Sequence, residues 1–183
     1  MSAAEYVDPR TRRTRARLAR AMAETVLTAP LAEVSVAGLC RTAGVHRTTF
    51  YKHFRTITEL ADAVLGELFD RIDALGPASD RRVRLEGLLE HAAARRRTYA
   101  PLIGPDGDPT LSRAVAERLV AAAGRVLAPA EHDGAGGTGT ATLARVSGFA
   151  AYGALEAVLL GTEPSAAGRA CELSLRGEVM LDR

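Results

Sequence analysis

Apolar residues recur three and four positions apart along most of the chain, which is the spacing of one face of an α-helix. The first such series predicts a helix over residues 11–29, with arginines on its opposite face and with the apolar residues Leu18, Met22, Val26 and Leu27. Pro30 ends this helix, because proline has no backbone N–H to donate. Later series are separated by breaks at 101–109 and 128–139 and predict helices over residues 80–97, 109–128, 140–161 and 165–180.

Residues 34–45 predict a short helix followed by a tight turn. Ser35 precedes the apolar positions and is placed to cap the helix with its hydroxyl group. Three side chains would point inward from this helix: Val36, Leu39 and Cys40. Gly44 then supplies the turn, because glycine adopts a left-handed backbone without a steric cost.

A second short helix is expected over residues 46–53, with Phe50 and Phe54 four residues apart on one face. Placing Phe50 in the core puts Thr48 and Lys52 nearly opposite it, because each residue turns the helix by about 100°. The flanks of this outward face then carry Thr49 and Tyr51. The alternative for Tyr51 is a core position with a solvated hydroxyl group.

Neither short helix is long enough to be stable alone, so both must pack on the helix predicted over residues 11–29. Two short helices joined by a turn and packed on a third form a helix-turn-helix unit, whose second helix enters the DNA major groove. Hydroxyl and ammonium groups on the outward face can donate to phosphates and base edges, and threonine methyl groups can contact thymine.

Thr56 and Glu59 have the spacing of a capping box and open the next series. This series predicts a connecting helix over residues 56–75, which ends at a Gly-Pro pair. The expected domains are residues 1–55, with an arm over 1–10, and residues 56–183.

Composition supports an all-α protein. Apolar residues make up 47% of the chain, but aromatic residues make up only 4% and tryptophan is absent. Alanine, leucine and arginine, which favour helices, are abundant, whereas the aromatic residues that favour strands are scarce. The predicted fold class is therefore all-α.

Charge divides unevenly between the two expected domains. Residues 1–55 carry ten basic and four acidic side chains, whereas residues 56–183 carry fourteen basic and eighteen acidic ones. A basic first domain suits a polyanionic partner, because phosphate neutralisation supplies most of the non-specific affinity for nucleic acid. The alternative is an N-terminal segment that only keeps the chain in solution.

No arrangement of catalytic or metal-binding residues stands out in the sequence. Cys40 and Cys171 lie far apart and are expected to be buried reduced thiols, and His46 and His53 lack the spacing of a metal pair. The glycine-rich stretch 134–139 has no following lysine and no preceding strand, so it is expected to be a linker. We expect no enzyme activity, no cofactor and no metal, although an all-α enzyme remains the competing class.

Neither a secretory signal nor a membrane span is expected. The first residues lack the layout of a signal peptide, and no apolar run is expected to reach the roughly 18 residues of a span. The expected location is the cytoplasm, without a membrane partner.

The run VSVAGLCRTAGVHRTTFYKHFRTITEL closely resembles the DNA-binding signature of the tetracycline-repressor (TetR) family. The matching parts are the Val-x-x-Leu-Cys helix, the Ala-Gly-Val turn, Thr49-Phe50-Tyr51 with His53-Phe54, and Glu59-Leu60 at the expected distance. The resemblance covers about residues 11–75. It implies a three-helix DNA-binding domain at the N-terminus and a helical ligand-binding and dimerisation domain at the C-terminus.

The resemblance also implies which residues meet double-stranded operator DNA. Ser35 would meet a phosphate at its helix N-terminus, and the full expected set is Arg12, Ser35, His46, Arg47, Thr48, Thr49, Tyr51, Lys52 and His53. Two positions depart from the family pattern. His46 replaces a small hydroxyl residue, and Ile57 replaces a lysine for which Arg55 is a candidate substitute.

In the second domain, the resemblance implies a homodimer formed by the last two helices, the alternative being that both close the core of one subunit. It also implies a pocket for a small-molecule effector, with candidate residues His91, Tyr99, Phe149, Tyr152 and Glu156. Each of these is alternatively a core residue. The expected function is a repressor that an effector releases from its operator; the alternative is an activator, or a regulator without an inducer.

Overall fold

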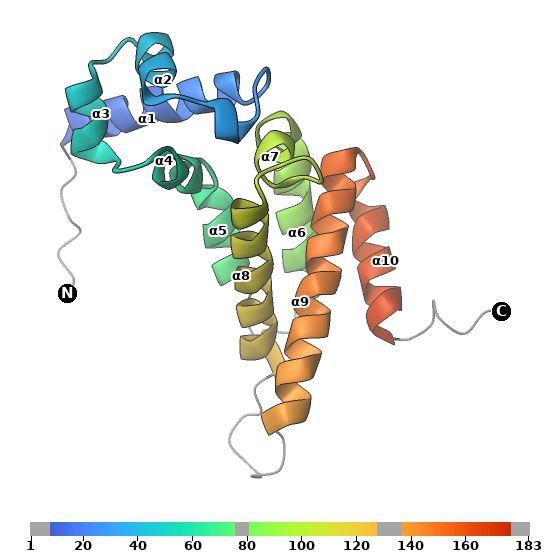
Figure 1. Cartoon of the computed structure of the whole chain (residues 1–183). Coiled ribbons are helices and arrows are strands. Elements are labelled where there is room, and N and C mark those ends of the chain that lie inside the picture. Colours follow the sequence, from blue (N-terminus) through green and yellow to red (C-terminus); the bar gives the residue numbers. More distant parts are fainter. Residues whose placement is uncertain (1–7, 76–80, 128–136, 177–183) are drawn as a thin grey trace. The chain divides into compact units, whose positions relative to one another are not determined.

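The computed structural model describes residues 8–75, 81–127 and 137–176 (Figure 1). Within these ranges the regular secondary structure is entirely helical, and the predicted all-α class is confirmed. The chain divides into two compact units, one up to Leu65 and one from Gly66. Each unit has its own core and is described by itself.

The first unit is built on helix α1, Pro9–Thr25. A short 3-10 helix, η1, Leu31–Glu33, leads into α2, Val36–Ala43, α3, Arg47–His53, and α4, Ile57–Val64. Helices α2, α3 and α4 all pack against α1. Five side chains at the centre of this core are fully buried: Leu18, Met22, Leu39, Phe50 and Leu60.

Hydrogen bonds fix the ends of the short helices as the sequence predicts. The Ser35 hydroxyl oxygen accepts from the Gly38 N–H at 3.1 Å and caps α2, and Gly44 ends this helix in the left-handed region with φ of 61°. The Thr56 hydroxyl oxygen accepts from the Glu59 N–H at 3.1 Å, while the Glu59 carboxylate accepts from the Arg55 N–H at 2.6 Å. The Ser35 and Thr56 caps satisfy backbone donors that a helix leaves free at its N-terminus, and the Glu59 carboxylate fixes the residue before the Thr56 cap.

Helix α1 begins earlier than the sequence suggests. Asp8 accepts from the Arg10 N–H at 3.0 Å, and Pro9 occupies the first helical position, where its missing N–H costs nothing. Residues 9 and 10 of the expected arm therefore belong to α1, which corrects the predicted bounds of the arm, and Arg12 lies within α1. Residues 1–7 of the expected arm lie outside the described residues.

The expected connecting helix over residues 56–75 is two helices. Helix α4 ends at Val64, and α5, Gly66–Asp73, starts after Leu65. Gly66 is a weak helix former at the junction. The division between the units falls at this break, and not after Arg55, because α4 packs against α1.

The second unit consists of α5 and five longer or equal helices: α6, Arg81–Ala94; α7, Arg96–Ile103; α8, Pro109–Leu127; α9, Gly137–Leu160; and α10, Pro164–Arg176. Helices α8 and α9 run antiparallel, side by side, and α9 also contacts α6, α7 and α10 (Figure 1). Gly148 of α9 permits this approach, because a Cβ atom there would lie 2.5 Å from the Val120 Cα of α8.

Two expected breaks are shorter than predicted. Helix α7 occupies part of the break placed at 101–109 and contains Pro101, and the burial of Tyr99, Leu102 and Ile103 explains why it forms despite the proline. Residues 137–139 of the expected linker belong to α9, whereas 134–136 lie outside the described residues, as do 177–180 of the last predicted helix.

Helix α9 contains a longer apolar stretch than expected from the sequence. Its stretch Gly139–Leu160 is 22 residues long with a mean hydropathy of 1.4, which by length and composition alone is enough to cross a membrane. The expectation that no apolar run reaches this length is therefore wrong. One such helix says little about membranes, since the core helix of a globular protein passes the same test. Only 33% of its most apolar window is buried, so α9 presents apolar surface outward.

Candidate nucleic-acid interface

The outward face of α3 combines polar side chains with an exposed aromatic ring. Phe50 is completely buried, whereas its neighbour Tyr51 is 59% exposed. Thr48 and Lys52 are exposed as well, on the side of the helix opposite Phe50. The structure thus brings together the three side chains on which the predicted reading surface depends.

An edge-to-face contact with the Phe50 ring holds the Tyr51 side chain in place. The centroids of Phe50 and Tyr51 are 5.4 Å apart with the rings at 88°, and Phe50 in turn packs against Phe54 at 5.9 Å. Edge-to-face pairs of this kind are favourable for aromatic rings. Two buried phenylalanines therefore anchor the helix from behind and restrict the direction in which the exposed ring points.

The other predicted residues of the reading helix surround this centre. His46 is the N-cap residue of α3, and its side chain makes no capping hydrogen bond. His46 and Arg47 are exposed, whereas Thr49 and His53 are half-buried. Ser35, at the start of α2, is exposed with its hydroxyl oxygen already accepting the capping bond.

Two arginines of α1 have structural partners that the sequence did not reveal. The Arg17 guanidinium donates to the Gly44 carbonyl oxygen at 2.9 Å, and the Arg15 guanidinium lies 5.0 Å from the centre of the Phe54 ring. Arg17 thus ties α1 to the turn between α2 and α3. Both contacts join residues far apart in the chain, so no local pattern could have indicated them.

Of the candidate effector residues, the structure brings His91 and Tyr99 into direct contact. The ring Nε2 atom of His91 is 3.1 Å from the Tyr99 hydroxyl oxygen, and both side chains are buried. The Tyr152 hydroxyl donates elsewhere, to the Ile103 carbonyl oxygen at 3.0 Å. Phe149 is exposed and Glu156 is half-buried.

An arginine and a carboxylate complete the surroundings of the His91–Tyr99 pair. Arg95 lies 3.2 Å from Nδ1 of His91 and forms an ion pair with Glu67 at 2.6 Å. Burial lowers the pKa of His91, with help from the Arg95 and Arg71 charges. Burial also raises the pKa of Tyr99 to about 12. Both groups are therefore neutral near pH 7, as expected of a satisfied polar pair in a core.

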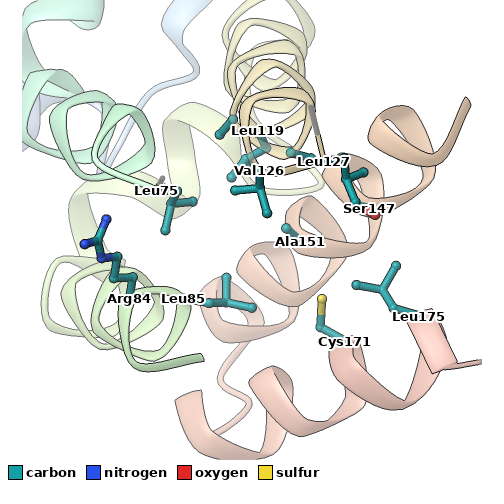
Figure 2. Close-up of a pocket in the computed structure, with 12 residues that line it drawn as sticks. Leu75, Arg84, Leu85, Leu119, Val126, Leu127, Ser147, Ala151, Cys171 and Leu175 are labelled. Carbon is teal, nitrogen blue, oxygen red and sulfur yellow. The ribbon is translucent and has the colours of Figure 1, made fainter. Parts of the chain in front are cut away.

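A separate cavity of about 100 Å³ lies in the second unit, lined by Leu75, which follows α5, and by residues of α6, α8, α9 and α10 (Figure 2). Its walls are mostly aliphatic, including Leu85, Leu119, Val126 and Ala151. The candidate effector residues are not among those that line it.

Comparisons with known proteins identify the fold. A scan against protein-family models finds no match, and a search of curated proteins finds no similar sequence. Among solved structures, NalD of Pseudomonas aeruginosa, the secondary repressor of the MexAB-OprM multidrug efflux pump, is similar with a TM-score of 0.66 and 18% identity, over 95% of this chain and 99% of NalD.

Two further structures agree with this assignment. The dihydroxyacetone kinase operon activator DhaS has a TM-score of 0.63 and 16% identity, over 91% of this chain and 96% of its own. A TetR transcriptional regulator from Rhodococcus sp. RHA1 has a TM-score of 0.53 and 22% identity, over 91% of this chain and 98% of its own. At these identities the similarity establishes the fold, and on that basis this chain has the fold of the TetR transcriptional regulators.

Proposed function

We propose that the protein is a sequence-specific DNA-binding transcription regulator. The observation that carries the proposal is the outward face of α3, where Thr48, Tyr51 and Lys52 are exposed over a buried phenylalanine. A major groove admits one helix, and hydroxyl and ammonium donors on that helix match the acceptors of base edges and phosphates. The structural neighbours, which are regulators by their names, support the same function.

Roles can be proposed for each residue of the DNA surface. Thr48, Tyr51 and Lys52 would face the bases, because they lie at the centre of the outward face. The remaining residues would contact phosphates or the groove edges: Arg12, Ser35, His46, Arg47, Thr49 and His53. The positive charge of residues 1–55 suits these contacts.

The regulator is proposed to act as a homodimer through α9 and α10. Helix α9 exposes Val146 (55%) and Leu160 (70%), and α10 exposes Leu173. Exposed apolar side chains in number on neighbouring helices are typical of a protein–protein interface. Two copies related by a twofold axis would present two reading helices to a palindromic operator.

We further propose that the protein represses transcription and that a small-molecule effector releases it from its operator. The protein would act in the cytoplasm, and it would act by binding and not as an enzyme. NalD supports repression by its name, whereas the name of DhaS supports activation as the second candidate. Both modes require the same DNA-binding surface.

A DNA titration at several salt concentrations tests the function. The duplexes are the DNA flanking the gene of this protein and a scrambled sequence of equal length. The proposal predicts tighter binding to the flanking DNA and a steep fall in affinity as salt rises, because phosphate contacts release counterions. Absence of binding to either duplex at low salt would exclude a DNA-binding regulator.

A further inference from the structure

We propose that the effector is a compact, uncharged and predominantly apolar molecule of about one ring, and that it binds in the aliphatic cavity of the second unit. The inference rests on the proposed regulatory function, because it gives that function a ligand class and a place of binding. The cavity is an alternative to the ligand site expected from the sequence, because none of the residues expected there lines it: His91, Tyr99, Phe149, Tyr152 and Glu156.

The lining selects an apolar ligand. Figure 2 shows Leu85, Val126, Ala151 and Leu175 placed around one space, on α6, α8, α9 and α10. Each of these side chains offers only carbon to a bound molecule. Burial of apolar surface is then the main driving force for binding.

Charge in the ligand is disfavoured by what the lining provides. Among the described residues that line the cavity, Arg84 carries the one formal charge, and its guanidinium donates to the Ala74 carbonyl oxygen at 2.8 Å. Figure 2 shows this guanidinium at the edge of the lining, pointing away from Ala151 and Cys171. A charged ligand group would therefore lose its hydration without gaining an ion partner in the interior.

The lining leaves room for one polar group on the ligand. Apart from Arg84, its polar side chains are Ser147 and Cys171. The serine hydroxyl can exchange one hydrogen bond with a ligand. Burial raises the pKa of the Cys171 thiol, so the sulfur is a neutral part of the wall.

Size limits the ligand further. The cavity of about 100 Å³ is smaller than the enclosed engineered cavity of roughly 150 Å³ that binds benzene, but it is partly open to solvent, so a single ring with a small substituent can enter it. Larger ligands would need the helices to separate. A compact ring compound is therefore the expected occupant.

The cavity adjoins the C-terminal end of α5, which two arginines of α8 hold in place. Arg118 donates to the Asp73 carboxylate at 2.6 Å, and Arg125 donates to the Asp73 carbonyl oxygen at 3.2 Å. Leu75, two residues further along, lines the cavity. A ligand that displaces Leu75 would strain these contacts, and α5 follows α4 in the chain after a single residue. Ligand binding can thus reach the helix that leads to the DNA-binding unit.

The test compares two probes on the full-length protein, toluene as the uncharged ring and benzoate as its charged counterpart. Calorimetry is expected to detect toluene but not benzoate. Ala151→Leu places three more carbons in the cavity and should weaken toluene binding by about tenfold or more. Ala121→Leu makes the same change at an exposed position of α8 that lies outside the lining, and it should leave toluene binding unchanged.

Ala123→Leu is a second cavity-filling variant, for use if Ala151→Leu does not fold. The proposal is overturned if toluene does not bind to folded protein, if benzoate binds as well as toluene, or if neither folded filling variant weakens toluene binding. It is also overturned if toluene binds and leaves the affinity for operator DNA unchanged. Failure of the DNA-binding function is distinguishable, because the protein would then bind no DNA with or without toluene.

Discussion

Phe50 and Tyr51 are consecutive residues in opposite environments. The phenylalanine is completely buried in the first core, and the tyrosine is 59% exposed with its ring edge against the phenylalanine. In such an exposed position a large aromatic ring keeps apolar surface in contact with water. A partner that covers the ring would remove this surface from water, which is favourable. We infer that DNA is this partner.

Replacing Tyr51 tests its role directly. Tyr51→Ala should weaken binding to operator DNA by about 1–3 kcal/mol, because a base or sugar contact is lost. The melting temperature should stay the same, since the side chain is exposed. Phe50→Ala is the contrasting variant and should destabilise the fold by about 3–5 kcal/mol. A fall in the melting temperature of Tyr51→Ala would instead assign Tyr51 to the core.

Arginines of α1 divide into two kinds by their contacts. Arg17 donates to the Gly44 carbonyl oxygen and so helps to fix the turn that orients α3. Arg12 is exposed in the first turns of the same helix. The first is therefore a positioning residue and the second a candidate phosphate contact.

The salt dependence of DNA binding distinguishes these roles. Arg12→Gln should reduce the slope of log K against log salt by about one, because one phosphate contact is lost. Arg17→Gln should leave the slope unchanged but reduce the preference for operator over scrambled DNA, since α3 is less firmly held. Equal slopes for wild type and Arg12→Gln would remove Arg12 from the interface.

The hydrogen bonds around His91 determine which of its ring nitrogens carries the proton. Arg95 can only donate, so Nδ1 of His91 accepts, and the ring proton is on Nε2, which donates to the Tyr99 oxygen. A second proton on Nδ1 would face the Arg95 donor. Burial, followed by the charges of Arg95 and Arg71, holds the pKa of His91 below its ordinary value of 6.5, although Glu67 opposes the shift.

Stability should therefore fall in mild acid. Below pH 6.5 the unfolded chain takes up a proton at His91 before the folded protein does, so the free energy of unfolding decreases as pH falls towards the lowered pKa. Urea unfolding between pH 7.5 and 5.5 measures this loss. His91→Gln should show a shallower dependence on pH, and identical profiles for the two proteins would contradict the assignment.

At the scale of helices, the features that depend on neighbouring residues can be predicted from the sequence, whereas those that depend on contacts with distant residues cannot. The caps at Ser35 and Thr56 and the turn at Gly44 are local, so the sequence alone predicts α2, α3 and the start of α4. The break at Leu65 and the helix through Pro101 depend on packing with distant residues. The same reason explains why the contacts of Arg15 and Arg17 and the lining of the cavity are not apparent in the sequence.

Close contact between α8 and α9 depends on Gly148. Gly148→Ala should destabilise the second unit by about 1–3 kcal/mol, because a Cβ atom would lie 2.5 Å from the Val120 Cα. Gly87→Ala is the matched control, since nothing lies within 4 Å of a Cβ atom there, and it should stabilise α6 by about 0.5–1 kcal/mol. Chemical denaturation of both variants measures the difference. Similar effects of both substitutions would argue against this packing.

At the scale of the whole molecule, charge and apolar surface are separated along the chain. Residues 1–55 are basic, whereas the apolar surface of α9 and α10 belongs to the second unit. One part of the chain thus suits a polyanion, and another suits a second copy of the chain. A dimer would make twice as many phosphate contacts with one operator as a single copy of the chain would.

A substitution at Val146 tests whether α9 forms the dimer interface. Val146→Glu should convert the dimer to monomers and lower the affinity for operator DNA, because a charge cannot be buried unpaired in an apolar interface. Ala121→Glu places the same charge on an exposed position of α8 and should change neither property. Sedimentation velocity measures the oligomeric state. A dimer that persists in Val146→Glu would move the interface away from this part of α9.

The most direct test of DNA reading by α3 is protein footprinting with hydroxyl radicals, with and without operator DNA. If the outward face of α3 reads DNA, bound DNA should lower the oxidation rate of Tyr51 strongly and leave that of Tyr152, in the second unit, unchanged. An oxidation rate of Tyr51 that stays the same when the protein is saturated with DNA would contradict the claim that the outward face of α3 reads DNA.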